Sequence, residues 1–148
     1  MSADVLLQGP PLFGSPGAET AFLVARVVFG VIFAFFGLNH FLNAETMVGY
    51  AGAKGVPAPN LMVPATGGML LFGGLGVLLG VFPTLAAGAV VVFLLVTTPL
   101  MHDFWAASDA ERMTEMTQFL KNVALLGAAA GFLALSGSPW PLAVGVGL

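Results

Sequence analysis

The 148-residue sequence contains no cysteine and has few charged residues. Without cysteine the chain cannot form disulfides, use thiol redox chemistry, hold an Fe–S cluster through thiolates or attack with a cysteine nucleophile. Only 7% of the residues are charged, against roughly 25% in soluble domains. Four Lys and Arg residues and a formal net charge of -3 argue against a nucleic-acid-binding surface and against a polybasic lipid-binding patch.

Long polar stretches are also lacking, and apolar residues fill most of the chain. Hydrophobic residues make up 58% of the sequence, and the mean hydropathy is +0.99. These values predict an integral membrane protein with one domain, because no hydrophilic stretch is long enough to form a separate soluble domain. Any function must therefore come from the helices and their short connections.

Four stretches are long and apolar enough for the roughly 20 residues that a bilayer crossing needs. The uncharged stretch 61–101 would be roughly 62 Å long as one helix, about twice the hydrocarbon thickness. It must therefore form a hairpin, with Gly80 and Pro83-Thr84 at the break. The predicted fold is an all-α membrane protein, a four-transmembrane-helix bundle with spans at about residues 21–42, 61–82, 85–101 and 119–136.

The segments outside the spans are short. Residues 1–20 lack the basic start of a secretory signal and are predicted to be an amino-terminal arm, in which Val5–Leu7 and Leu12–Phe13 could dip into the membrane interface. Short interfacial helices are predicted in both the 1–2 and the 3–4 connections, the second beginning at Ser108 as a capping box. Residues 137–148 are an apolar carboxyl tail without a functional signal.

Helical periodicity places one polar and glycine-rich stripe on the first span. At 100° per residue, one narrow face carries Arg26, Gly30, Phe33, Gly37 and His40, and we expect this face to look into the bundle. Two further small-x-x-x-small patterns, Gly76–Gly80 and Gly127–Gly131, are typical of close helix packing. Three residues are predicted to be membrane anchors: Arg26, Trp105 and Trp140. A functional role for Arg26 is the alternative to anchoring.

Three polar pairs stand where spans meet connections. Four spans place both termini on one side of the membrane and both polar connections on the other. The shared connection side would then carry Asn39-His40, His102-Asp103 and Lys121-Asn122. Acidic residues nearby could act as counter-ions: Glu45, Asp109, Glu111 and Glu115, while Lys54 is expected to face headgroups. Such a set could bind an anionic or carbonyl-bearing headgroup, or pass protons to a reducible ring such as a quinone. The alternative is that interfaces collect polar residues without any ligand.

Other chemistries have no supporting motif. The two histidines have no spacing typical of a metal or haem site, and no serine lies in a G-x-S-x-G context. The glycine-rich stretches lack the strand and lysine of a phosphate-binding loop. We therefore assign no metal ligand and no catalytic residue, and leave open whether the chain is an enzyme.

Several motifs together resemble the DoxX family of small four-helix membrane proteins. They are Arg26-x3-Gly30, Gly37-x-Asn39-His40, the Gly55–Pro59 connection, Gly73-Gly74 to Gly80, His102-x-Phe104-Trp105, and the stretch FLKNVALLG from Phe119 to Gly127. The resemblance covers about residues 20–136, and the FLKN element is its most specific part. Many relatives carry a glutamate shortly before the paired glycines, whereas residues 66–72 here contain no acid.

The resemblance implies a multi-pass protein of a prokaryotic cell membrane, associated with oxidoreductase systems. We therefore predict a membrane subunit of a quinone-linked redox assembly. Its quinone-like or lipid headgroup site would be formed by His40, His102, Lys121 and Asn122, oriented by Asn39 and Asp103. No cofactor is expected within the chain other than a bound quinone. Expected partners are membrane lipids, another membrane or peripheral redox subunit and a second copy of the chain, with no nucleic acid. The alternative is a non-catalytic scaffold that packs through its glycine-rich helix faces.

Overall fold

The computed structural model describes residues 11–147, so the predicted interfacial segment Val5–Leu7 lies outside the described residues. Within residues 11–147 the chain forms five α-helices and, as its only β-structure, an isolated bridge between Val81 and Val146. The helices are α2 (Ala18–Leu42), α3 (Ala44–Ala53), α4 (Pro59–Leu79), α5 (Pro83–Met101) and α6 (Arg112–Leu135). Helices α2, α4, α5 and α6 are long and apolar enough to cross a membrane. This confirms the predicted all-α fold with four spans.

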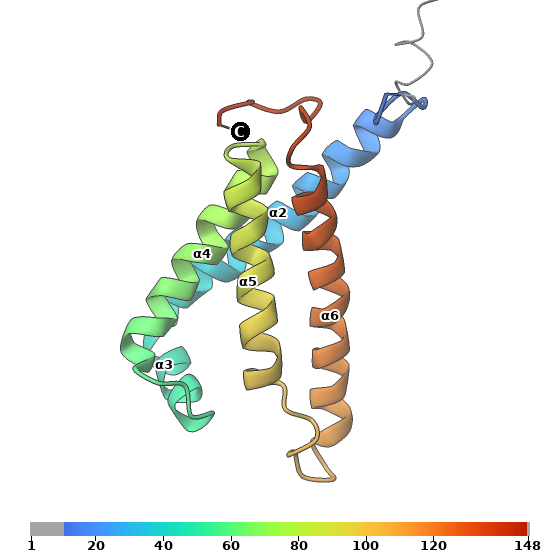
Figure 1. Cartoon of the computed structure of the whole chain (residues 1–148). Coiled ribbons are helices and arrows are strands. Elements are labelled where there is room, and N and C mark those ends of the chain that lie inside the picture. The colour runs from blue at the N-terminus through green and yellow to red at the C-terminus, as the bar shows by residue number, and fades with distance from the viewer. Residues whose placement is uncertain (1–10, 148) are drawn as a thin grey trace, which may run out of the picture.

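Helices α2 and α4 form the most extensive helix pair, and glycines allow their close approach (Figure 1). A Cβ built on Gly30 would lie 2.6 Å from the carbonyl oxygen of Gly74, and one on Gly37 would collide with the backbone of Leu71. Real Cβ atoms do not come this near to backbone atoms. The inward stripe predicted on the first span is confirmed, because Arg26, Gly30, Phe33 and Gly37 are buried and His40 is half-buried.

The predicted hairpin between the second and third spans is present. Helix α4 ends at Gly80, whose φ of 67° lies in the left-handed region that glycine tolerates best. The Gly80 amide donates to the carbonyl oxygen of Gly76, and so does the Val81 amide at 2.9 Å. Pro83 begins α5, where its missing N–H leaves no helical hydrogen bond unmade. The glycine and the proline together fix the reversal.

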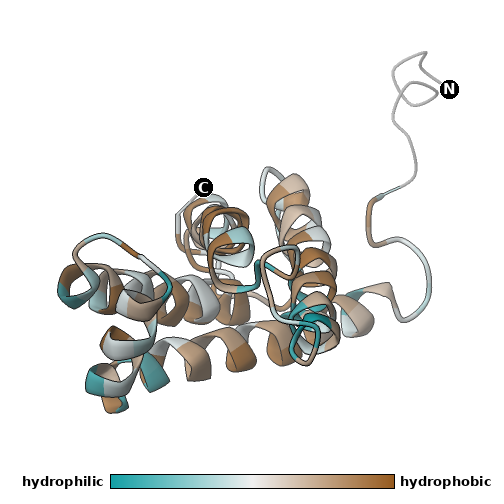
Figure 2. Ribbon diagram, turned by 90° about the horizontal axis from the view of Figure 1, so that it is seen from below, coloured by the Kyte–Doolittle hydropathy of each residue, from teal (hydrophilic) through white to brown (hydrophobic). Residues whose placement is uncertain are grey.

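The two polar connections differ from one another. The first contains the short helix α3, as expected. In the second, the expected separate helix is the first part of α6, which runs from Arg112 past Phe119 to Leu135. This corrects the prediction, and the physical reason is that residues 112–119 contain neither glycine nor proline to interrupt the helix. Figure 2 shows hydrophilic residues gathered on α3 and at the α5–α6 connection, with hydrophobic residues along the long helices.

Aromatic side chains fill the end of the bundle that is nearest the carboxyl tail. The Phe22 ring lies 5.7 Å from Phe132 and 5.2 Å from Trp140, and Phe29 lies 5.0 Å from Phe132. These contacts join α2, α6 and the tail. Helix α6 otherwise contributes only Ala129 to the buried residues, so most of its surface is left uncovered by the described chain.

Candidate functional site

The last turn of α2 presents Asn39 and His40 on the side of α3 and α5. His40 Nδ1 lies 2.8 Å from the carbonyl oxygen of Phe36, one turn earlier. The His40 ring also meets the Phe93 ring edge-on, with centroids 6.3 Å apart. These contacts fix the imidazole against α2 and α5.

A cavity of about 230 Å³ lies beside this imidazole. All five helices contribute to its lining: Phe33, Phe36, Asn39 and His40 from α2, Met47 from α3, Leu70 from α4, Phe93 and Leu94 from α5, and Asn122 and Leu125 from α6. The walls are mainly aromatic and aliphatic, and the polar lining residues are Asn39, His40 and Asn122. Apolar walls with a few polar groups that fix orientation are typical of small-molecule sites. Three of the six predicted site residues therefore line one cavity.

The second predicted pair that contains a histidine, His102-Asp103, lies in a separate polar cluster between the two connections. His102 Nδ1 is 2.8 Å from Glu115 Oε2, so the expected counter-ion role of Glu115 applies to this histidine. Asp103 Oδ1 accepts from Lys54 Nζ at 2.8 Å. This hydrogen bond holds the pKa of the Asp103 carboxyl below its ordinary value and raises the pKa of Lys54. None of these four residues lines the cavity.

Two sequence expectations about lysines are changed by this arrangement. Lys54, which was expected to face headgroups, instead ties the end of α3 to the segment after α5. Lys121 is exposed and does not line the cavity, although its neighbour Asn122 does. Of this pair, Asn122 alone reaches the cavity.

Arg26 is 1% exposed, and it joins three parts of the chain. Its guanidinium donates to the carbonyl oxygens of Val77 and Leu78 at the end of α4, at 3.2 and 2.9 Å. It also donates to the carbonyl oxygens of Pro141 and Leu142 in the tail, at 2.7 and 3.4 Å. The structure thus places this predicted anchor inside the bundle. Its four partners could not be predicted from the sequence, because all of them are backbone oxygens.

The guanidinium also lies against two aromatic rings, with Arg26 Cζ 5.8 Å from the Phe22 centroid and 5.5 Å from the Trp140 centroid. Such distances are within the range of cation–π attraction. Trp140 is buried and donates from Nε1 to the Leu135 carbonyl oxygen at 2.9 Å. Trp105 is 58% exposed and stacks edge-on with Phe104. Of the two tryptophans predicted to be anchors, Trp105 alone presents most of its surface outward.

The predicted packing glycines lie in different surroundings. Gly30 and Gly37 face α4, and a Cβ on Gly76 would lie 2.5 Å from the Cβ of Ala86 in α5. Gly80 caps α4. Gly127 and Gly131 have no atom within 4 Å of an added Cβ, so no other helix packs closely on them within the described chain.

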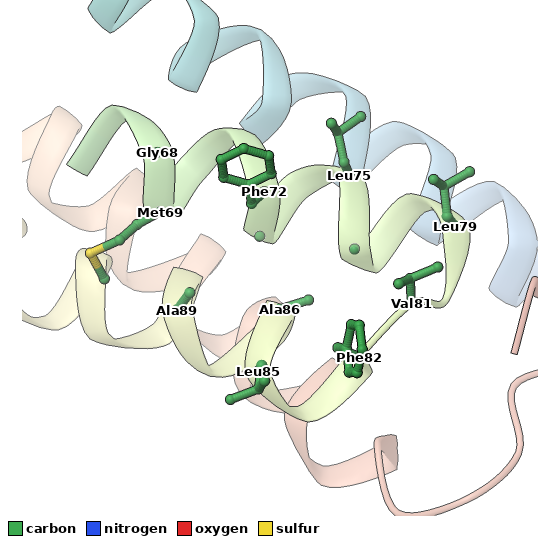
Figure 3. Close-up of a pocket in the computed structure, with 12 residues that line it drawn as sticks. Gly68, Met69, Phe72, Leu75, Leu79, Val81, Phe82, Leu85, Ala86 and Ala89 are labelled. Carbon is green, nitrogen blue, oxygen red and sulfur yellow. The ribbon is translucent and has the colours of Figure 1, made fainter. Parts of the chain in front are cut away.

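A larger cavity is a groove of about 500 Å³ between α4 and α5 (Figure 3). It is lined by Phe72, Leu75, Leu79, Phe82 and Leu85, with small residues such as Gly73 and Ala86 between them. No charged or amide side chain lines it. The groove can take a hydrocarbon chain but offers no group for chemistry, so the smaller cavity beside His40 is the better candidate for the site. In residues 11–147, no three His, Asp or Glu residues are grouped as metal ligands would be.

Comparison with known families agrees with this architecture. The family model DoxX matches residues 21–103. The chain belongs to the DoxX family. The matched region includes most of α2 and all of α3 to α5, and therefore Asn39 and His40, whereas Asn122 and the FLKN element lie beyond its end. No curated protein and no solved structure matches the chain.

For this DoxX protein, the family and the four apolar helices indicate a multi-pass membrane protein in contact with lipid. DoxX proteins are associated with membrane redox-related roles. The cavity beside His40 and the cluster of Lys54, His102, Asp103 and Glu115 are the two polar features at the end of the bundle that carries the connections. Only the first combines polar groups with a cavity that could hold a ligand.

Proposed function

We propose that this chain is a membrane subunit of a quinone-linked redox assembly and that it holds a quinone-like ring in the cavity beside His40. The observation that carries the proposal is the meeting of Asn39, His40 and Asn122 on one aromatic-walled cavity. Hydrogen-bonding groups at one end and aromatic walls elsewhere suit a ring that carries oxygen substituents. Family membership supports a redox setting.

The chain supplies binding groups rather than an electron carrier of its own. It has no cysteine for thiolate ligation. In the proposed assembly, electrons therefore pass through the bound ring or through a redox centre on a partner subunit. His40 is the residue able to exchange a proton with the ring, while the two amides hold the ring by hydrogen bonds. His102 and Asp103, paired with Glu115 and Lys54, would stabilise the connections.

The experiment is to purify the protein in mild detergent, extract it with organic solvent and measure quinone per protein. The wild type should retain quinone, and His40→Ala should lose most of it. His102→Ala is the matched control, because it removes the same side chain from outside the cavity. An extract of the wild type that is free of quinone, or equal retention in both variants, would contradict the proposal. Retained phospholipid in place of quinone would favour a lipid headgroup as the ligand.

The proposed setting is a prokaryotic cell membrane with both termini on the same side. Because the natural sequence lacks cysteine, single cysteines can be introduced without removing others. Membrane-impermeant thiol reagents should label Ser15→Cys and Ser138→Cys from the same side. They should label Ser108→Cys from the opposite side.

A scaffold function is the second candidate, and the uncovered surface of α6 favours it. Gly127 and Gly131 leave open space on this helix, and small-x-x-x-small faces allow another helix to approach closely. The covering helix would come from a second copy or from another membrane subunit. Under this alternative, Gly127→Leu should abolish co-purification of that partner while leaving quinone retention unchanged. The opposite pattern, in which Gly127→Leu has no effect on assembly, would count against it.

A further inference from the structure

The hydrogen bond at one ring nitrogen of His40 decides what the other nitrogen can do. The carbonyl oxygen of Phe36, 2.8 Å from Nδ1, can only accept a hydrogen bond. Nδ1 must therefore carry the hydrogen and donate it. In the neutral imidazole the second nitrogen, Nε2, then has a lone pair and no hydrogen, so it can only accept.

The neighbouring amides complete the pattern of donors and acceptors. Asn39 Oδ1 accepts from Asn43 Nδ2, which leaves the Asn39 side-chain N–H groups as donors. None of the side-chain hydrogen bonds among residues 11–147 uses Asn122, so its amide can both donate and accept. Among the polar residues that line the cavity, His40 thus has an acceptor nitrogen left for a ligand, Asn39 has its donor N–H groups, and Asn122 has both kinds of group.

The cavity has room for a small ring. A closed cavity of about 150 Å³ lined by Leu, Ile and Phe is known to bind benzene. The cavity beside His40 measures about 230 Å³, which is enough for one six-membered ring with substituents. The volumes of about 300–1,000 Å³ that drug-sized ligands occupy are larger. A long tail on the ring would extend beyond this volume through the open side of the cavity.

We infer that the cavity recognises a hydroxyl-bearing aromatic ring of the hydroquinone or phenol class, whose O–H donates to His40 Nε2. This inference rests on the proposed function, in which the cavity binds a ring, and it adds which form of the ring is preferred. A ring that carries only carbonyl or ether oxygens would place an acceptor against the acceptor Nε2. One hydrogen bond would then be missing and both atoms would be left without a partner. The donor groups of Asn39 and Asn122 can serve a second oxygen on the ring.

The inference can be tested with two probes that do not undergo quinone redox chemistry. Para-methoxyphenol carries one hydroxyl, whereas para-dimethoxybenzene has the same ring with that hydroxyl methylated. Their dissociation constants are measured by saturation-transfer NMR on the full-length protein in detergent. The wild type should bind the phenol about tenfold more tightly, as expected for one hydrogen bond to a group that is otherwise left unpaired.

Matched variants assign the preference to one atom. His40→Phe keeps a ring of similar size but removes the acceptor, so the two probes should then bind equally. His102→Phe makes the same change outside the cavity and should retain the tenfold preference. These comparisons also cancel the different partitioning of the two probes into detergent, because each probe meets the same detergent in all samples.

The outcomes separate this inference from the proposed function. Binding of both probes with no preference in the wild type would overturn the inference and leave the ring site standing. A preference that survives in His40→Phe would overturn the role of His40 Nε2. Failure of both probes and of extracted quinones to bind the wild type would overturn the proposed function and the inference together.

Discussion

Arg26→Met is the substitution for which the structure predicts the largest loss of stability. The variant keeps a long apolar stem but removes every donor to the carbonyl oxygens of residues 77, 78, 141 and 142. A buried carbonyl that loses its donor costs about 1–3 kcal/mol, and this applies in full to Val77, because the other three bonds are only partly buried. Part of this is offset, because the variant no longer buries a charge, whose desolvation costs several kcal/mol. We expect a net loss of about 2–4 kcal/mol.

The assay is thermal unfolding in mild detergent, combined with hydrogen exchange of the tail. At about 2–4 °C per kcal/mol for a chain of this size, the Tm should fall by on the order of 5–15 °C. The Val144 amide, which donates to the Leu79 carbonyl oxygen at 2.8 Å, should exchange faster because Arg26 no longer holds the tail. Arg26→Lys should be intermediate, since one ammonium cannot reach both segments as the planar guanidinium does.

Arg112→Met is the control, because this exposed arginine forms a surface ion pair with Asp109, at 3.3 Å, and its loss should change the Tm little. The reasoning would be refuted by an Arg26→Met variant with the Tm of the wild type and unchanged exchange at Val144. That result would mean that water or lipid satisfies the four carbonyls as well as the guanidinium does.

Further predictions concern the glycine contacts and the polar cluster between the connections. Gly37→Ala should destabilise the protein by about 2–4 kcal/mol, because its Cβ would collide with the Leu71 backbone and force α2 away from α4. Gly127→Ala, where the added Cβ meets open space, should leave the Tm unchanged or raise it slightly. The Lys54–Asp103 pair should make a small contribution to stability that depends on pH. The Asp103 part is complete above its ordinary pKa of 3.8 and is lost as the pH falls through the lowered folded value. The Lys54 part is complete below its ordinary pKa of 10.5 and is lost as the pH rises through the raised folded value. A double-mutant cycle with Lys54→Met and Asp103→Asn should therefore give a coupling energy near pH 7 that disappears at both extremes. A coupling that is independent of pH would contradict this.

The fold was largely predictable because it follows from composition and helical period. The lack of charge between residues 61 and 101 requires a hairpin, and the spacing from Arg26 to His40 indicates which face of α2 is buried. Glycine and proline marked the reversal at residues 80–83. The error in the second connection was twofold: the helix begins at Arg112 with Glu111 as its N-cap rather than at Ser108, and it continues into the fourth span without a break.

The candidate site was only partly predictable. The topology correctly suggested that polar pairs gather at one end of the bundle, but it could not show that they divide into two groups. That division depends on the rotation of α6, which turns Asn122 inward and Lys121 outward, and on the non-helical segment after α5, which turns Asp103 toward Lys54. The role of the tail could not be predicted, because the tail contacts Arg26 through backbone carbonyls. Every residue has a backbone carbonyl, so the residue types do not indicate which ones bind the guanidinium.

The hydrogen bonds of Arg26 have a consequence for the order in which the helices can assemble during synthesis. The guanidinium lies in the first span, but its tail partners are 115 and 116 residues further along the chain. When α2 is made, none of the four carbonyls exists, and a charged side chain is costly within the hydrocarbon region. While the first span is nascent, Arg26 must therefore stay in water, among headgroups or against the insertion machinery until α4 and the tail have been synthesised. Final placement of α2 would then be among the last events of folding, so deletion of the tail that carries the carbonyl groups of residues 141 and 142 should reduce membrane insertion as well as stability.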